Sequence, residues 1–125
     1  MRSSCLATYS LVLMFIGQAN ASPEHASLMT CPEPSQIVSE QGGQLYTAPG
    51  GWKGDANSTS IDLAHLRFVS SHITPASVLC RYEDDRKHKA HIDHLSLSME
   101  GARLAVGSNW MNATCESKIE ECFFK

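Results

Sequence analysis

The segment from residue 88 to residue 94, HKAHIDH, concentrates side chains that can bind metal ions. Its candidate ligands are His88, His91, Asp93 and His94, and its three histidines are half of the six in the chain. Imidazole suits zinc and copper, and a histidine-rich tract is a compositional signal for metal binding. On a helix, His91 lies one turn from both other histidines. On a strand, His88 and His94 share a face that His91 does not. Neither arrangement alone completes a tetrahedral site.

The residues before this tract favour a simpler interpretation. Residues 83–85 are acidic, and residues 86–89 carry three cationic side chains and one histidine. Mixed charge between two apolar segments is typical of a solvated hairpin loop. Adjacent carboxylates on a loop seldom converge on one buried bond, so acid–base catalysis is not indicated. We therefore expect an exposed connection between a strand that ends near Tyr82 and a strand that begins near Leu95.

Sequence motifs of the common enzyme classes are absent. The chain has no G-x-S-x-G, H-E-x-x-H or C-x-x-C motif and no glycine-rich phosphate loop. Serines and histidines are numerous enough that a Ser–His–Asp set could be drawn by chance. We therefore expect no enzymatic activity and no cofactor.

Trp52 and Trp110 are the candidate binding residues among the aromatics. Exposed, either ring could stack on a sugar or fill a pocket of a protein partner. Buried, the two rings would fill a core with few other large side chains. Burial is favoured for Trp110, whereas Trp52, which lies among glycines, fits either role equally.

The first 21 residues have the order of a secretory signal peptide. Arg2 is their only charge, an apolar run covers residues 9–16, and the small residues Ala19 and Ala21 follow. The apolar run is too short for a bilayer, which takes roughly 20 residues to span. We expect cleavage before Ser22 and export to the periplasm or the medium. No later segment is apolar enough for membrane insertion.

The charge balance excludes one class of partner. The formal net charge is −3, and loss of Arg2 with the signal peptide would change it to −4. A mildly acidic chain without a basic stripe lacks the electrostatic footprint of nucleic-acid binding. The expected partner is therefore a protein or a glycan.

Cysteine content predicts how the small domain is stabilised. Cys5 leaves with the signal peptide, and four cysteines remain: Cys31, Cys80, Cys115 and Cys122. An even number in a short exported domain predicts two disulfides. A four-thiolate zinc site is a poor alternative without a C-x-x-C pair. Of the three possible pairings we favour Cys31 with Cys80 and Cys115 with Cys122. The first ties the N-terminal extension to a central strand, and the second closes a short loop.

Alternating apolar residues predict the central strands. Residues 95–99 alternate without error, as a strand with one solvated face should. Residues 77–82 place Val78, Cys80 and Tyr82 on one face. Both segments therefore belong to a sheet that buries one side.

The remaining segments complete a fold of short strands separated by glycine and proline turns. We expect a first hairpin over residues 37–47 and a weaker strand within residues 103–106. In the tail, residues 115–124, Cys115, Ile119 and Cys122 fit a helical face, whereas residues 119–124 fit a strand, which we favour. These patterns predict one all-β domain over residues 31–125, an antiparallel sandwich or curled sheet, after a flexible leader of residues 22–30.

Several short motifs follow one another along the mature chain. They are CP at 31–32, YTAP at 46–49 with GW at 51–52, LCRY at 79–82, Trp110, and a final CF pair at 122–123. Their order resembles a family of small exported bacterial proteins catalogued as a domain of unknown function. The resemblance covers most of the mature chain. It implies a small exported β domain and carries over no catalytic residues.

Three functions follow, in order of preference. The first is an exported, disulfide-stapled binding or interaction domain. The second is a periplasmic metal-binding protein that uses residues 88–94, and the third is a small hydrolase.

Overall fold

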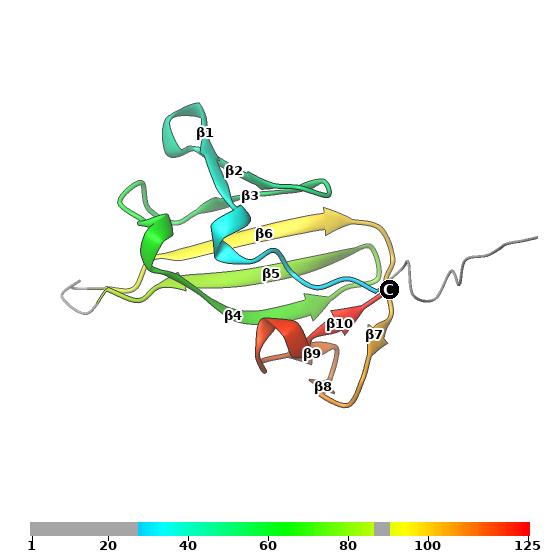
Figure 1. Ribbon diagram of the computed structural model, residues 1–125. Coiled ribbons are helices and arrows are strands. Elements are labelled where there is room, and N and C mark those ends of the chain that lie inside the picture. Colours follow the sequence, from blue (N-terminus) through cyan, green and yellow to red (C-terminus); the bar gives the residue numbers. More distant parts are fainter. Residues whose placement is uncertain (1–27, 87–90) are drawn as a thin grey trace, which may run out of the picture.

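Short strands and single 3-10 turns make up the part of the chain that the structure describes, residues 28–86 and 91–125 of a computed structural model (Figure 1). The strands are β1 (Val38–Glu40), β2 (Leu45–Ala48), β3 (Trp52–Ala56), β4 (Leu66–Ile73), β5 (Ser77–Asp84), β6 (His94–Glu100), β7 (Ala105–Val106), β8 (Trp110–Met111), β9 (Thr114–Cys115) and β10 (Phe123–Phe124). The 3-10 turns are η1 (Pro34–Gln36), η2 (Gln41–Gly43), η3 (Leu63–His65) and η4 (Ile119–Glu121).

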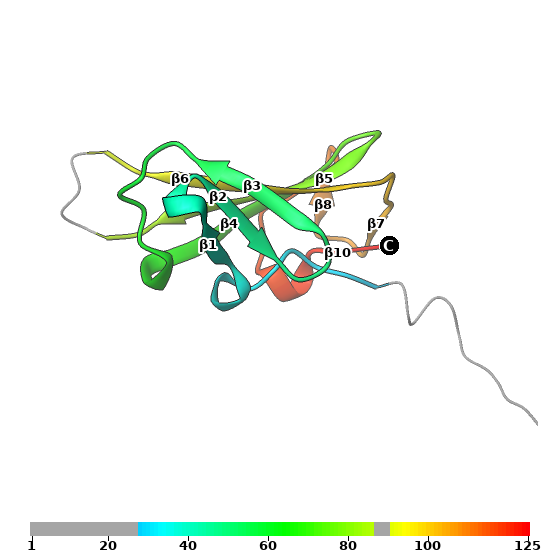
Figure 2. The same cartoon turned by 90° about the horizontal axis from the view of Figure 1, so that it is seen from above.

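Eight of these strands form one antiparallel sheet in the order β1-β2-β3-β6-β5-β4-β9-β8. Strand β10 pairs with β7 in a second, two-stranded sheet. In Figure 2, strands β2 and β3 run at an angle to β5 and β6, which is the twist expected of a large sheet. The predicted all-β antiparallel fold is confirmed. Within the described residues, no helix has the length and apolar character needed to cross a membrane.

The core lies on one face of the sheet, where the predicted alternation places it. Val78, Cys80 and Tyr82 of β5 are fully buried, and so are Leu95 and Leu97 of β6. Alternate residues of these strands are more exposed, which is the pattern of a sheet buried on one side.

Gly54 of β3 allows a close approach between strands. It pairs with Leu97, and a Cβ atom at this position would lie 2.8 Å from the carbonyl carbon of Ser96. A side chain here would push β3 away from β6, so glycine is required by the backbone contact.

The N-terminal segment crosses the core face of the sheet (Figure 1). The Cys31–Cys80 disulfide joins this segment to β5, and the Tyr82 hydroxyl donates a hydrogen bond to the Pro32 carbonyl at 2.6 Å. Met29 exchanges backbone hydrogen bonds with Phe124 at 2.8 and 2.9 Å. Met29, near the end of the expected flexible leader, is therefore paired with the domain.

The C-terminal tail differs from its prediction. Residues 119–121 form a 3-10 turn, and only Phe123 and Phe124 form a strand. The Cys115–Cys122 disulfide closes a separation of only seven residues, so the chain must turn between them. Both favoured disulfide pairings are confirmed. The strand expected within residues 103–106 is reduced to two residues.

Candidate binding groove

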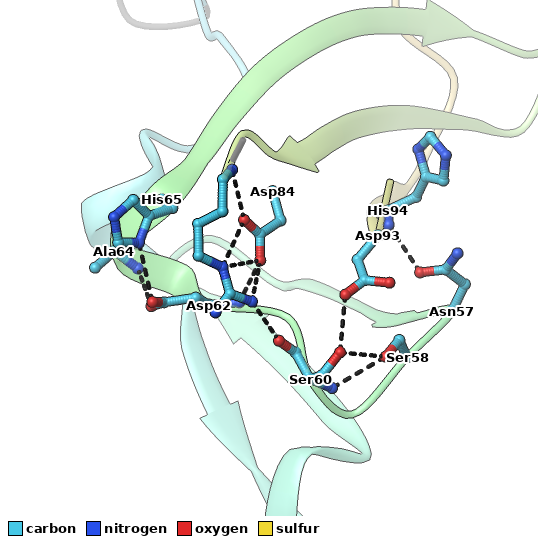
Figure 3. A network of polar contacts seen from close by, with 10 residues as sticks. Asn57, Ser58, Ser60, Asp62, Ala64, His65, Asp84, Asp93 and His94 are labelled. Carbon is cyan, nitrogen blue, oxygen red and sulfur yellow. Dashed lines mark hydrogen bonds and ion pairs between the residues drawn. The ribbon is translucent and has the colours of Figure 1, made fainter. Parts of the chain in front are cut away.

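Among the described residues, the structure does not bring the candidate metal ligands His91, Asp93 and His94 together. His88 lies outside the described residues. His91 is exposed between β5 and β6, as expected, but Asp93 is fully buried. Figure 3 shows the His94 ring pointing away from Asp93, and its Nδ1 lies 3.7 Å from a carboxylate oxygen of Glu83. In residues 28–86 and 91–125, no three histidine, cysteine or acidic side chains are placed to hold a metal ion.

The acidic residues 83–85 were expected to be solvated, but Asp84 is buried. Its side chain is buried at the end of β5 and receives hydrogen bonds from Arg86, with Nη2 at 2.7 Å and Nε at 3.0 Å (Figure 3). The Asp62 backbone N–H donates to the same carboxylate at 3.0 Å. The Arg86 guanidinium therefore holds the pKa of Asp84 well below its usual range. The paired charge locks the strand end to the neighbouring loop.

The same contacts extend to the loop before β4. Arg86 donates to the Ser60 carbonyl at 2.6 Å, and the Ser60 hydroxyl donates to Asp93 at 3.0 Å. We call Ser60, Asp62, Asp84, Arg86 and Asp93 the strand-end network. Its bonds tie a loop to the ends of β5 and β6, which is a structural role. In residues 28–86 and 91–125, the histidine rings that form hydrogen bonds pair with Asp62 and Thr114, and no hydrogen bond joins one of them to a serine hydroxyl.

The two tryptophans lie in different environments. Trp52 is 5% exposed and meets Phe124 edge to face, with ring centroids 6.2 Å apart. Burial removes Trp52 as a surface for a ligand. Trp110 is half-buried, and its Nε1 donates to the Phe123 carbonyl at 2.9 Å. Its polar edge is thus used within the protein.

An open groove lies on the core side of the sheet, where three separate parts of the chain meet. Glu33 and Pro34 of the N-terminal segment, residues 116–121 and Phe68 of β4 line it. We call the first two groups its walls and Phe68 its base. Its volume is about 620 Å³, within the usual range for ligand sites. Figure 1 shows the N-terminal segment and η4 on the same side of the sheet, with β4 between them. We call this feature the Phe68 groove.

Each wall of the Phe68 groove is held by one disulfide. The Cys31–Cys80 bond anchors the chain just before Glu33 and Pro34. The Cys115–Cys122 bond encloses residues 116–121. Both walls are therefore held covalently, and a site held in this way would lose little conformational freedom if it bound a ligand.

The base of the groove is a preorganised aromatic surface. Phe68 is only partly buried, and its ring meets Tyr82 edge to face at 5.9 Å and 71°. Pro34 adds partly exposed apolar surface, and Ile119, which also lines the groove, is largely buried. Three other hollows on the described surface have no aromatic side chain in their lining.

The rim of the groove is strongly acidic. Glu33, Glu116, Glu120 and Glu121 line it with a single cation, Lys118, which gives these residues a formal charge of −3. Glu121 accepts a hydrogen bond from Ser117. Within the described residues, the other three glutamates form no ion pair. Burial raises the pKa of the nearby Tyr82, and the negative charge of Glu33 adds to this effect.

Comparison with known proteins gives no relatives. No family model matches the chain, and neither the curated proteins nor the solved structures contain a match. The resemblance to a family of exported bacterial proteins therefore stays a prediction.

The Phe68 groove was not predicted from the sequence. One signal was available, since the segment ESKIEE between Cys115 and Cys122 holds three glutamates in six residues. A short disulfide-closed loop with that composition must expose its charges. Only the tertiary fold places this loop beside Pro34 and Phe68, so the groove itself does not follow from the sequence.

Proposed function

We propose that this protein is an exported binding domain whose ligand site is the Phe68 groove. The observation that carries the proposal is the groove itself, with an aromatic base and two walls that are each fixed by a disulfide. Covalent bracing of an open surface favours recognition of a partner, because a rigid site loses little conformational freedom on binding.

Export is supported by two independent features. The N-terminal residues have the order of a signal peptide, and disulfides persist mainly in oxidising compartments. Intact mass of the secreted protein tests this part of the proposal. We expect a mature chain that begins at Ser22, and a product that still carries Met1 would contradict it.

Chemical-shift mapping tests the binding site. The oxidised, isotope-labelled protein is titrated separately with short peptides of alternating lysine and glycine, glutamate and glycine, or serine and glycine, and with a neutral oligosaccharide. We expect at least one probe to shift the amides of Phe68 and residues 116–121. Shifts confined to the strand-end network, or no shifts with any probe at millimolar concentration, would overturn the proposed site.

A further inference from the structure

We infer that the Phe68 groove binds an extended, lysine- or arginine-rich peptide segment, with one cationic side chain laid over the Phe68 ring. This inference rests on the proposed function and names the partner class of the same site. It follows from the shape of the groove, from its base and from the sign of its rim.

The shape favours an extended chain. The groove is open to solvent and lies between two walls that come from distant parts of the sequence. An open channel of this kind leaves a small molecule largely hydrated, whereas an extended peptide can contact both walls and the base together.

The base suits the stem and the charge of a long cationic side chain. Lysine and arginine carry apolar methylene groups that pack on apolar surface while the charged end stays in water. Phe68 and Pro34, which are both partly exposed, provide most of that surface, whereas Ile119 is largely buried. The exposed face of an aromatic ring also attracts a cation directly.

The rim supplies charge complementarity. Glu33 lies on one wall, and Glu116 and Glu120 lie on the other, so a bound cation would have carboxylates on both sides. The formal charge of the groove residues is −3, and that of the mature chain without Arg2 would be −4. Most of the net negative charge of the mature chain therefore belongs to the groove, which favours attraction of a basic segment there.

Fluorescence anisotropy with labelled peptides tests the inference on the oxidised protein. The lysine–glycine peptide is compared with its glutamate–glycine counterpart at about 20 mM salt and at about 300 mM salt, where screening shortens the reach of surface charges. We expect binding of the lysine peptide alone, weakened strongly by salt.

Two matched variants locate the binding. The groove variant is Glu33→Gln/Glu116→Gln/Glu120→Gln. The control variant is Glu40→Gln/Asp55→Asn/Glu100→Gln, which changes the net charge equally at exposed positions outside the Phe68 groove. We expect the groove variant to weaken binding about tenfold or more and the control variant to weaken it less than about twofold. Equal losses would show attraction to the whole acidic surface and would overturn the inference.

A third variant, Phe68→Leu, keeps an apolar base and removes the ring. We expect about a two- to fivefold weaker affinity, the size of an exposed cation–π contact. An unchanged affinity would show that the Phe68 ring makes no cation–π contact with the peptide. If the acidic peptide or the oligosaccharide instead shifts the groove amides, the proposed site stands and the cationic partner is wrong. If no probe shifts them, both fail.

Discussion

The strand-end network and the Phe68 groove both gather charged side chains, but they use charge in opposite ways. In the network, Asp84 is buried and meets the cation of Arg86 at 2.7 Å. At the groove, Glu33, Glu116 and Glu120 share one sign and stay exposed. Loss of one partner from a buried ion pair destabilises the fold, because the other charge is left uncompensated. Exposed charges of one sign around an apolar base remain available to a partner. The comparison separates a structural cluster from a candidate site.

The largest expected effect concerns the disulfides that hold the two groove walls. The Cys31–Cys80 bond spans 49 residues and the Cys115–Cys122 bond spans seven. Loop-closure entropy predicts a loss of about 4 kcal/mol in the free energy of unfolding for Cys31→Ala/Cys80→Ala. The loss for Cys115→Ala/Cys122→Ala should be about 2.5 kcal/mol. Urea denaturation measures both, and a reversed order would contradict this account.

Loss of the second disulfide should also distinguish the two regions. Hydrogen exchange of Cys115→Ala/Cys122→Ala should become faster at residues 116–121, because the wall loses its closure. Exchange at the amides of Asp62 and Arg86, which are hydrogen-bonded to Asp84, should change little. Equal acceleration in both places would mean that the groove and the network unfold as one unit.

The next effect concerns the network itself. The variant Asp84→Asn keeps the shape of the side chain but removes the charge that Arg86 faces. We expect a loss of about 2 kcal/mol in the free energy of unfolding, since hydrogen bonds to charged groups contribute about 1.5–3 kcal/mol. The groove variant should change it by less than about 0.5 kcal/mol, as surface substitutions do. Thermal or urea denaturation of both proteins makes the comparison.

The Asp84–Arg86 ion pair should also affect how the free energy of unfolding depends on pH. The pKa of Asp84 is lower in the folded state than in the unfolded chain, so its stabilisation is present above the unfolded value, about 3.9. That stabilisation is lost as the pH falls from about 5 towards the folded pKa. Urea denaturation from pH 7 to pH 2 should show a shallower acid-side decline for Asp84→Asn than for the natural protein. Parallel curves would show that the ion pair does not control acid stability.

The smallest effect is expected in the histidine tract. His91 and His94 are exposed and their described neighbours form no metal site. The variant His91→Gln/His94→Gln should change the free energy of unfolding by less than about 0.5 kcal/mol. Zinc should raise the melting temperature little, because a ligand stabilises a protein only by binding its folded state. A melting temperature that rises with zinc only when the histidines are present would restore the metal-binding hypothesis.

Local sequence patterns predicted the sheet better than the site. Strands β5 and β6 follow from period-2 alternation, which depends on neighbouring residues alone. The burial of Asp84 could not be predicted in this way, because its partner Arg86 reaches it only after the chain turns at the strand end. The Phe68 groove was also hidden, since Pro34, Phe68 and Ile119 are far apart in sequence and meet only in the folded protein.

The most direct test compares the Kd of the lysine–glycine peptide for Asp84→Asn and for the groove variant, in one low-salt buffer at a temperature where both are folded. We predict that Asp84→Asn, although less stable, binds within about twofold of the natural protein. The groove variant, although equally stable, should bind about tenfold more weakly. Weaker binding by Asp84→Asn, with unchanged binding by the groove variant, would contradict the assignment of the Phe68 groove as the ligand site.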